Sequence, residues 1–406
     1  MGLAQLVFLT IWLLFIAVLA PFLWAAESDI KVKVLYLGQE YSGKKPLALV
    51  QQITTDGGLP GIRLAMDDNA TTGQFLGHQY QLDELIFPHD ADNQQLIDAV
   101  NQTDKPFVIV DLPAKQLLAI VDGLDPIPRR LFFNVRDKSI ALREQHCRTN
   151  VLHILPDRAM LADALAQYLL VKRWNKWLLV VGKHANDRAY ADAIENAAKK
   201  FNAKIVAKEE WRFEYGGRLV DSGHVTAKQE VSLMTQARGE NYDVVVVADE
   251  DDNFGEYLPY QTYIPRPVVG TQGLIATAWH RANELWGATQ IQRRFSKQAN
   301  GRYMTERDYA AWVAGRALGE AVTRINSTDV DAVRTQLLSN EFQLAAFKGV
   351  ALNFRNWNGQ LRQPILLAAP RMLVSVSPQA GFLHQFSALD TLGLDRPQTR
   401  CGAFKN

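Results

Sequence analysis

Residues 38–44, with the sequence GQEYSGK, have the spacing of a phosphate-binding loop and follow a stretch typical of a strand. In such loops the glycines let backbone amides approach a phosphate, while a lysine and a following Ser or Thr hold phosphate and magnesium. Here Lys45 replaces the Ser or Thr, and Pro46 interrupts the helix that should begin there. Both departures argue against an enzyme that hydrolyses nucleotides.

A second group of chemically competent residues is a run of four acids, DEDD, that begins at Asp249. Together with Asn253, this run has the opening spacing of a calcium-binding loop. Such a loop needs Gly and Glu at positions where this chain has Phe254 and Tyr260, so we expect no metal site. The acids also suit the exposed start of a helix, where they interact favourably with the helix dipole.

No set of side chains suited to catalysis is evident elsewhere in the sequence. The eight His residues are scattered without a His-x-x-x-His pair, and no Gly-x-Ser-x-Gly turn marks a serine nucleophile. The formal net charge is only +1, without the basic face typical of proteins that bind nucleic acids. We therefore predict a protein that is not an enzyme, binds no nucleic acid and needs no cofactor.

The elements that must position any site alternate between strand and helix. Short stretches rich in Val and Leu are separated by segments with helical spacing of apolar residues, a pattern typical of parallel sheets covered by helices. The alternation runs twice. We expect strands at 31–38, 79–87, 106–112, 129–135, 176–181, 203–211, 242–248 and 267–270, and helices at 57–77, 93–101, 114–123, 157–172, 185–201 and 225–238.

The last third of the chain is less regular. We expect helices at 276–287, 305–325 and 330–338, and a strand at 371–377. Between them we expect a hairpin of strands 350–354 and 363–368 that turns at Asn358-Gly359. A single core rarely grows to 406 residues, so two lobes are the default expectation. No low-complexity linker separates them, which suggests several short hinge crossings.

The N-terminal segment is almost unbroken apolar sequence over residues 6–26. We interpret residues 1–26 as a signal peptide that is cut near Ala25 or Ala26. No Lys or Arg precedes the apolar run, and Trp24 is large for its position, so an uncleaved membrane anchor is the alternative. Either interpretation places the remaining chain outside the cytoplasm, and we expect it in the periplasm.

Two cysteines, Cys147 and Cys401, are the complete set in the chain. In an oxidising compartment two thiols can pair, and we predict a disulfide that ties the C-terminal tail to the body. The alternative is a pair of unrelated buried thiols.

Three segments, taken in order, resemble those of type I periplasmic solute-binding proteins of ABC importers. They are GIRLAMDDN at 61–69 with Gly73 and LG at 76–77, then 156–170 leading into 176–181, then GVALNF at 349–354 with Asn358-Gly359 and Gln363. Within this family the chain is similar to the branched-chain amino-acid group. Residues 158–169 and 400–404 further resemble the subgroup that is associated with PQQ-dependent alcohol catabolism.

The resemblance implies an α/β protein with two Rossmann-like lobes, whose parallel sheets are joined by a multi-crossing hinge. It implies a monomeric substrate-binding component that captures a small solute between its lobes and delivers it to an ABC permease in the membrane. The alternative is a periplasmic ligand-sensing module that signals to a membrane partner without transport. We expect the signal peptide at 1–26, lobe 1 at 27–154, lobe 2 at 155–275, a helical region shared between the lobes at 276–348, mainly lobe 1 and then lobe 2, and C-terminal strands, hinge return and tail at 349–406.

Candidate ligand-binding residues follow the strands, because ligands of this fold lie at the C-terminal ends of parallel strands. Arg136 suits a bidentate clamp for a carboxylate; the alternative is a surface pair with Asp137. Asp249 and Glu250 lie where the family often places an acid that faces a ligand ammonium. The predicted set is Tyr41, Asp111, Arg136, Asp187, Tyr190, Asp249, Glu250 and Gln272.

One departure from the family concerns the loop after the third strand of lobe 1. Amino-acid binders of this family have a Ser/Thr-rich loop there, which clamps the α-carboxylate and α-ammonium groups. The matching stretch here is DLPA at 111–114, which has no hydroxyl group. This difference weakens the case for an amino-acid ligand.

Overall fold

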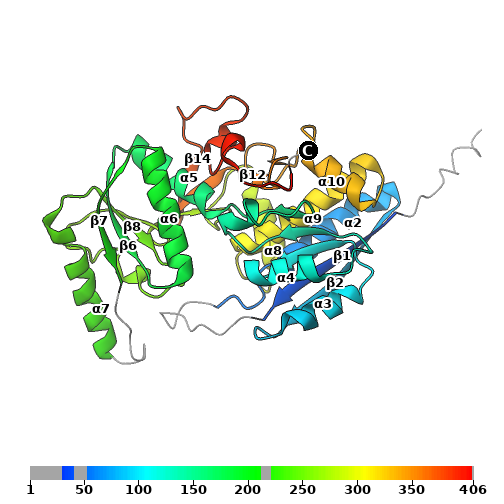
Figure 1. The fold of residues 1–406 in the computed structure, drawn as a ribbon, viewed down its shortest axis with the longest axis horizontal. Coiled ribbons are helices and arrows are strands. Elements are labelled where there is room, and N and C mark those ends of the chain that lie inside the picture. The colour runs from blue at the N-terminus through cyan, green and yellow to red at the C-terminus, as the bar shows by residue number, and fades with distance from the viewer. Residues whose placement is uncertain (1–29, 41–52, 212–220, 405–406) are drawn as a thin grey trace, which may run out of the picture.

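Two α/β lobes lie side by side in the computed structural model, which describes residues 30–40, 53–211 and 221–404 (Figure 1). The expected signal peptide, residues 41–44 of the phosphate-loop pattern and the candidate Tyr41 lie outside the described residues. Within those three ranges, no helix has the length and apolar character needed to cross a membrane.

Lobe 1 is built on a five-stranded parallel sheet in the order β2-β1-β3-β4-β5. Alternate residues of one strand serve opposite faces, so that Val34 and Tyr36 pack in one hydrophobic cluster, and Leu35 and Leu37 in another. The strands are β1 (Ile30–Gln39), β2 (His78–Phe87), β3 (Phe107–Asp111), β4 (Leu131–Asn134) and β5 (Val151–His153), and the helices are α2 (Leu59–Leu76), α3 (Asn93–Asn101), α4 (Ala114–Gly123), α8 (Ala288–Gln298), α9 (Glu306–Ile325) and α10 (Val330–Leu338).

Lobe 2 contains a seven-stranded sheet in the order β14-β13-β10-β9-β8-β6-β7. Five neighbouring strands of this sheet, β10, β9, β8, β6 and β7, pair in parallel. The strands β13 and β14 add antiparallel pairs at one edge. The strands are β6 (Lys176–Val181), β7 (Lys204–Glu210), β8 (Val244–Ala248), β9 (Val268–Gly270), β10 (Leu274–Thr277), β13 (Ile365–Ala369) and β14 (Met372–Ser377), and the helices are α5 (Arg158–Val171), α6 (Ala185–Lys200) and α7 (Asp221–Met234).

Three crossings join the lobes within the part of the chain that the structure describes. Crossing 1 (154–157) leads from β5 to α5, crossing 2 (278–287) leads from β10 to α8, and crossing 3 (363–364) leads from β12 (Leu361–Arg362) to β13. The strand β12 pairs with β11 (Asn353–Phe354) in a small hairpin around Asn358-Gly359, as expected. The second strand expected at 363–368 belongs instead to β13, which pairs with β10 and β14. The predicted class, two parallel-sheet lobes on a multi-crossing hinge, is confirmed.

The helix expected at 276–287 is wrong. The segment begins as the end of β10, where Ala276 and Thr277 pair with Leu367 and Leu366 of β13, and crossing 2 follows. Sheet pairing outweighs the helical propensity of this Ala-rich segment. The helix begins only at Ala288, after Gly287 adopts a left-handed conformation with φ 79°.

Buried polar side chains hold crossings 1 and 3 together. Arg143 of lobe 1 is fully buried and donates to the Leu155 carbonyl (3.0 Å) and to the Gln360 side-chain oxygen (2.9 Å). The Gln360 amide donates in turn to Leu155 (3.0 Å), and the Gln363 amide to the Ile154 carbonyl (2.7 Å). Because each donor is buried, these bonds fix where the chain passes between the lobes.

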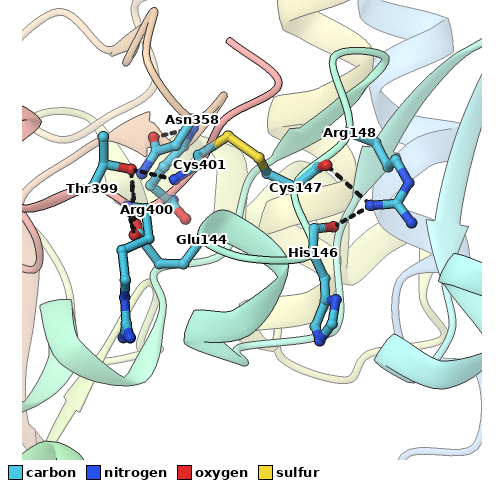
Figure 2. The surroundings of a disulfide bond; sticks show 9 residues. Glu144, His146, Cys147, Arg148, Asn358, Thr399, Arg400 and Cys401 are labelled. Carbon is cyan, nitrogen blue, oxygen red and sulfur yellow. Dashed lines mark hydrogen bonds between the residues drawn. A yellow bond between two sulfur atoms is a disulfide. The ribbon is translucent and has the colours of Figure 1, made fainter. Parts of the chain in front are cut away.

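The predicted disulfide between Cys147 and Cys401 is confirmed, with 5.7 Å between the two Cα atoms (Figure 2). It fastens the C-terminal tail to the segment of lobe 1 that precedes β5. Glu144 strengthens this attachment, because its carboxylate accepts hydrogen bonds from the Thr399 hydroxyl (3.1 Å) and from the Arg400 amide.

Candidate functional site: the interlobe cleft

A cleft of about 620 Å³ lies between the two lobes. Lobe 1 contributes residues that follow β3 and β4, together with the start of α9, and lobe 2 contributes residues that follow β6, β8 and β9. The C-terminal strand ends of both sheets therefore face the same space, which is where open α/β sheets bind ligands.

The structure brings most of the predicted ligand-binding residues to this cleft. Arg136, Tyr190, Asp249, Glu250 and Gln272 line it. Two further candidates, Asp111 and Asp187, lie beneath its walls with exposed fractions of 2% and 0%, respectively. A supporting role accounts for the position of both.

The wall of lobe 1 is organised around the buried Asp111 carboxylate. Its Oδ2 atom accepts hydrogen bonds from the Tyr36 hydroxyl (2.7 Å) and from Arg307 (2.6 Å). Burial, reinforced by the Asp111 charge, raises the pKa of Tyr36 well above its usual value, so Tyr36 remains a donor. Asp111 thereby anchors the first turn of α9 to the end of β3.

Arg136 lies beside this group and remains partly exposed to the cleft. Its Nε atom is 4.0 Å from the Asp111 carboxylate, and its Nη1 donates to the Asp111 carbonyl (3.3 Å). The alternative pairing partner, Asp137, instead accepts hydrogen bonds from the amides of Ala114 (2.9 Å) and Ser139 (2.8 Å). Arg136 is therefore oriented by Asp111, and one third of its side chain is exposed.

Two residues at the start of α9, Glu306 and Arg307, line the cleft but were not predicted from the sequence. Glu306 pairs with Lys138 and accepts a hydrogen bond from the Thr277 hydroxyl (3.0 Å), which connects lobe 1 to the end of β10. Burial alone would raise the pKa of Glu306, but these partners outweigh burial and lower the pKa. A basic residue in the first turn of a helix interacts unfavourably with the helix dipole. The position of Arg307 in the predicted helix at 305–325 could therefore have indicated that a carboxylate binds it.

The wall of lobe 2 is acidic, but its carboxylates are engaged. Arg158, the first residue of α5, forms a bidentate contact with Glu250, with a shortest N–O distance of 2.5 Å. The Gln272 amide donates to Asp252 (2.9 Å). Tyr190 is buried against this group, and burial together with the Glu250 charge raises its pKa.

Asp187 and Asp249 use their carboxylates to hold backbone in place. Asp187 caps α6, accepting from the backbone amides of His184 (3.1 Å) and Asp251 (3.1 Å). Asp249 accepts from the amides of Phe254 (2.8 Å) and Gly255 (2.6 Å), which shapes the loop after β8. Both carboxylates thus serve the shape of the wall.

Replacing Asp249 with alanine is expected to lower the free energy of unfolding by about 2–3 kcal/mol, because buried amides lose a charged acceptor. Urea unfolding checks this, with Asp192→Ala, an exposed carboxylate on α6, as the matched control. Unchanged stability together with lost ligand binding would instead assign Asp249 to the ligand.

Comparison with known proteins finds solved structures that are similar to this chain in fold. No protein-family model matches the sequence, and no curated protein is similar to it. A branched-chain amino-acid ABC transporter periplasmic ligand-binding protein from Burkholderia xenovorans is similar over 92% of this chain and 100% of its own, with a TM-score of 0.69 and 15% identity. A periplasmic binding protein from Burkholderia mallei covers 93% of this chain and 100% of its own, with a TM-score of 0.64 and 15% identity.

A third solved structure is a solute-binding protein of an ABC transporter from R. palustris in complex with benzoate. It covers 92% of this chain and 99% of its own, with a TM-score of 0.62 and 11% identity. At these identities the comparisons establish the fold, which is that of type I periplasmic binding proteins.

Proposed function

We propose that this chain is the substrate-binding component of an ABC-type importer and has no catalytic activity. It acts in the periplasm as a monomer, once its N-terminal segment has directed export. The observation that carries the proposal is a polar cleft between two lobes that are joined by three short crossings. Such a hinge lets each wall supply half of a binding site.

Lobe closure is the step that captures the solute. Only the closed form would satisfy both halves of the site, so a ligand shifts the equilibrium between open and closed forms toward closure. The closed form then delivers the solute to the membrane permease. The structural neighbours, whose names describe periplasmic or ABC-transporter binding proteins, support this proposal.

Arg136 is the proposed anchor for an anionic group of the ligand. Three described cations of lobe 1 line the cleft, and Arg136 is the one of these held least tightly, since Arg307 bonds directly to Asp111 and Lys138 to Glu306. A carboxylate can accept two parallel hydrogen bonds from a guanidinium. Residues 111–114 match the loop in which amino-acid binders of the family have hydroxyl groups, and Asp111 of this loop binds Arg307. The absence of a hydroxyl group in these four residues favours a ligand other than a simple amino acid.

A finer proposal concerns the solute. The resemblance of residues 158–169 and 400–404 to the subgroup associated with PQQ-dependent alcohol catabolism suggests a compound from that chemistry. The screen below therefore includes amino acids, alcohol-derived acids, aldehydes, cyclic quinone cofactors, and calcium and lanthanide salts.

The test is a thermal-shift screen of the exported chain against these compounds. A ligand at a hundred times its Kd stabilises the folded form by about 2.7 kcal/mol. Arg136→Ala is expected to weaken binding about tenfold or more, because a charge-assisted contact is lost. Calorimetric titration of the compound found in the screen measures the change in Kd.

Arg129→Ala is the matched control, since Arg129 precedes the same strand, β4, and has a side chain that is 72% exposed. It should bind the compound as the unaltered protein does. Equal affinity in Arg136→Ala would remove Arg136 from the site, and turnover of any compound would contradict the non-enzymatic proposal.

A further inference from the structure

Lys348 lies where crossings 2 and 3 of the hinge meet. Its side chain is buried, with 1% of the residue exposed. Its Nζ atom donates to the carbonyl of Ala278, in crossing 2, and to the carbonyl of Pro364, in crossing 3 (3.0 Å). One amino group therefore connects two of the segments on which the lobes must turn.

The surroundings of Lys348 provide little compensation for a charge. No carboxylate forms an ion pair with it among the described residues, and its Nζ atom lies 5.3 Å from the centre of the Tyr309 ring. Burial lowers the pKa of Lys348 to about 7, and the charge of Glu306 opposes this change.

Two residues of α9 act on Lys348: Glu306, whose charge affects its pKa, and Tyr309, whose ring lies beside the Nζ atom. Crossing 2 carries three ionisable residues beyond Ala278, namely His280, Arg281 and Glu284. Crossing 3 consists of Gln363 and Pro364 and has no ionisable residue. Titration at this position can therefore be assigned to Lys348 by replacing a small number of neighbours.

Lys348 is also connected to the cleft through Glu306. The Glu306 carboxylate lines the cleft and accepts the hydrogen bond from Thr277, the residue directly before Ala278. The charge on Lys348 and the charge on Glu306 thus act on the same short length of backbone, one from the hinge and one from the binding surface.

We propose that Lys348 is a pH-sensitive staple of the hinge, whose neutral amine keeps crossings 2 and 3 together and whose ammonium form favours an arrangement in which they move apart. The neutral amine can still donate to both carbonyls, while burying the ammonium carries a desolvation cost, so the hinge tightens as the proton is lost. This inference rests on the proposed function only in taking lobe closure as the binding step.

The direction of the linked effect on stability follows from the two states. The unfolded chain keeps Lys348 protonated up to its ordinary pKa of 10.5, whereas the folded protein releases the proton at about 7. Between these values the unfolded chain binds more protons, so the contribution of Lys348 to stability rises with pH. Below pH 7 both states are protonated and this contribution is absent.

The experiment measures lobe movement in the ligand-free, full-length exported chain. Fluorophores on Gln95 of α3 and Asn196 of α6, both exposed, report the distance between lobes by single-molecule energy transfer from pH 6 to 9. We expect the ratio of the two lobe arrangements to change about threefold, with a midpoint near the Lys348 pKa. Lys348→Met should abolish the change, and the control His280→Gln should keep it.

A pH response that persists in Lys348→Met, or that disappears in His280→Gln, would overturn the proposal. If Lys348→Met fails to fold, Glu306→Gln replaces it, since loss of the acid should move the midpoint to lower pH, and an unmoved midpoint contradicts the staple. Because no ligand is added, these outcomes are independent of whether the thermal-shift screen finds a solute.

Discussion

Replacing Asp390 with alanine is expected to lower the free energy of unfolding by about 3–5 kcal/mol, measured by urea unfolding. Asp390 lies in the C-terminal tail and is buried, as is its partner Arg355, at 2.9 Å. It also binds Arg362 of β12 at 2.8 Å, and the ring of Trp357 lies against both guanidinium groups. Alanine would leave two cations without a carboxylate in the protein interior, and that unpaired charge is the main cost.

The matched control is Asp104→Ala. Asp104 also contacts two cations, Lys33 and Lys105, but its side chain is 62% exposed, so water replaces the lost contacts. We expect this variant to unfold at nearly the same urea concentration as the unaltered protein. Equal effects of the two variants would show that burial does not set the strength of the Asp390 cluster.

Loss of the disulfide is expected to cost up to about 5 kcal/mol of folding free energy, by the chain-entropy model. The bond between Cys147 and Cys401 closes a loop with a sequence separation of 254, and the unfolded chain gains that freedom when the bond is absent. Urea unfolding of the double variant Cys147→Ser and Cys401→Ser, compared with the unaltered protein under oxidising conditions, measures the effect.

Reductant separates this effect from that of the serine side chains. It should destabilise the unaltered protein by a similar amount and leave the double variant unchanged. An unaltered protein that is insensitive to reductant, with its thiols shown to be free, would contradict the entropic explanation. Intact mass with and without reductant reports the bond, and the same measurement locates the N-terminal cut.

The lobes could be predicted from the sequence because their strands are short, apolar and regularly spaced. The strand β6 and the helices α3, α4 and α10 have the predicted bounds. Asp157, the first residue of the helix predicted at 157–172, caps α5 by accepting from the Met160 amide (2.8 Å). The segment 276–287 was misread because its first two residues belong to β10, where they pair with β13, nearly a hundred residues later. Ile291 and Phe295, four residues apart and buried, were the available signal for α8.

The cleft was predictable in position and less so in detail. A rule that selects residues after strands finds Arg136, Glu250 and Gln272, yet it cannot tell a carboxylate that faces solute from one that binds backbone, as Asp249 does. The same rule cannot find Arg307, because this residue lies in the first turn of α9 and follows no strand. Arg307 reaches the cleft because α9 packs on lobe 1. Side-chain partners depend on tertiary contacts that spacing does not encode.

The order of the segments has a consequence for how the chain acquires its structure. The core of lobe 1 needs α9 and α10, which follow the whole central part of lobe 2, and the sheet of lobe 2 in turn needs β13, which follows α10. Neither half can bury its apolar faces as a contiguous fragment, so a cut after residue 275 leaves both incomplete. Synthesis of the last hundred residues thus completes two domains almost at once, and an isolated lobe would have to be made by rejoining distant segments.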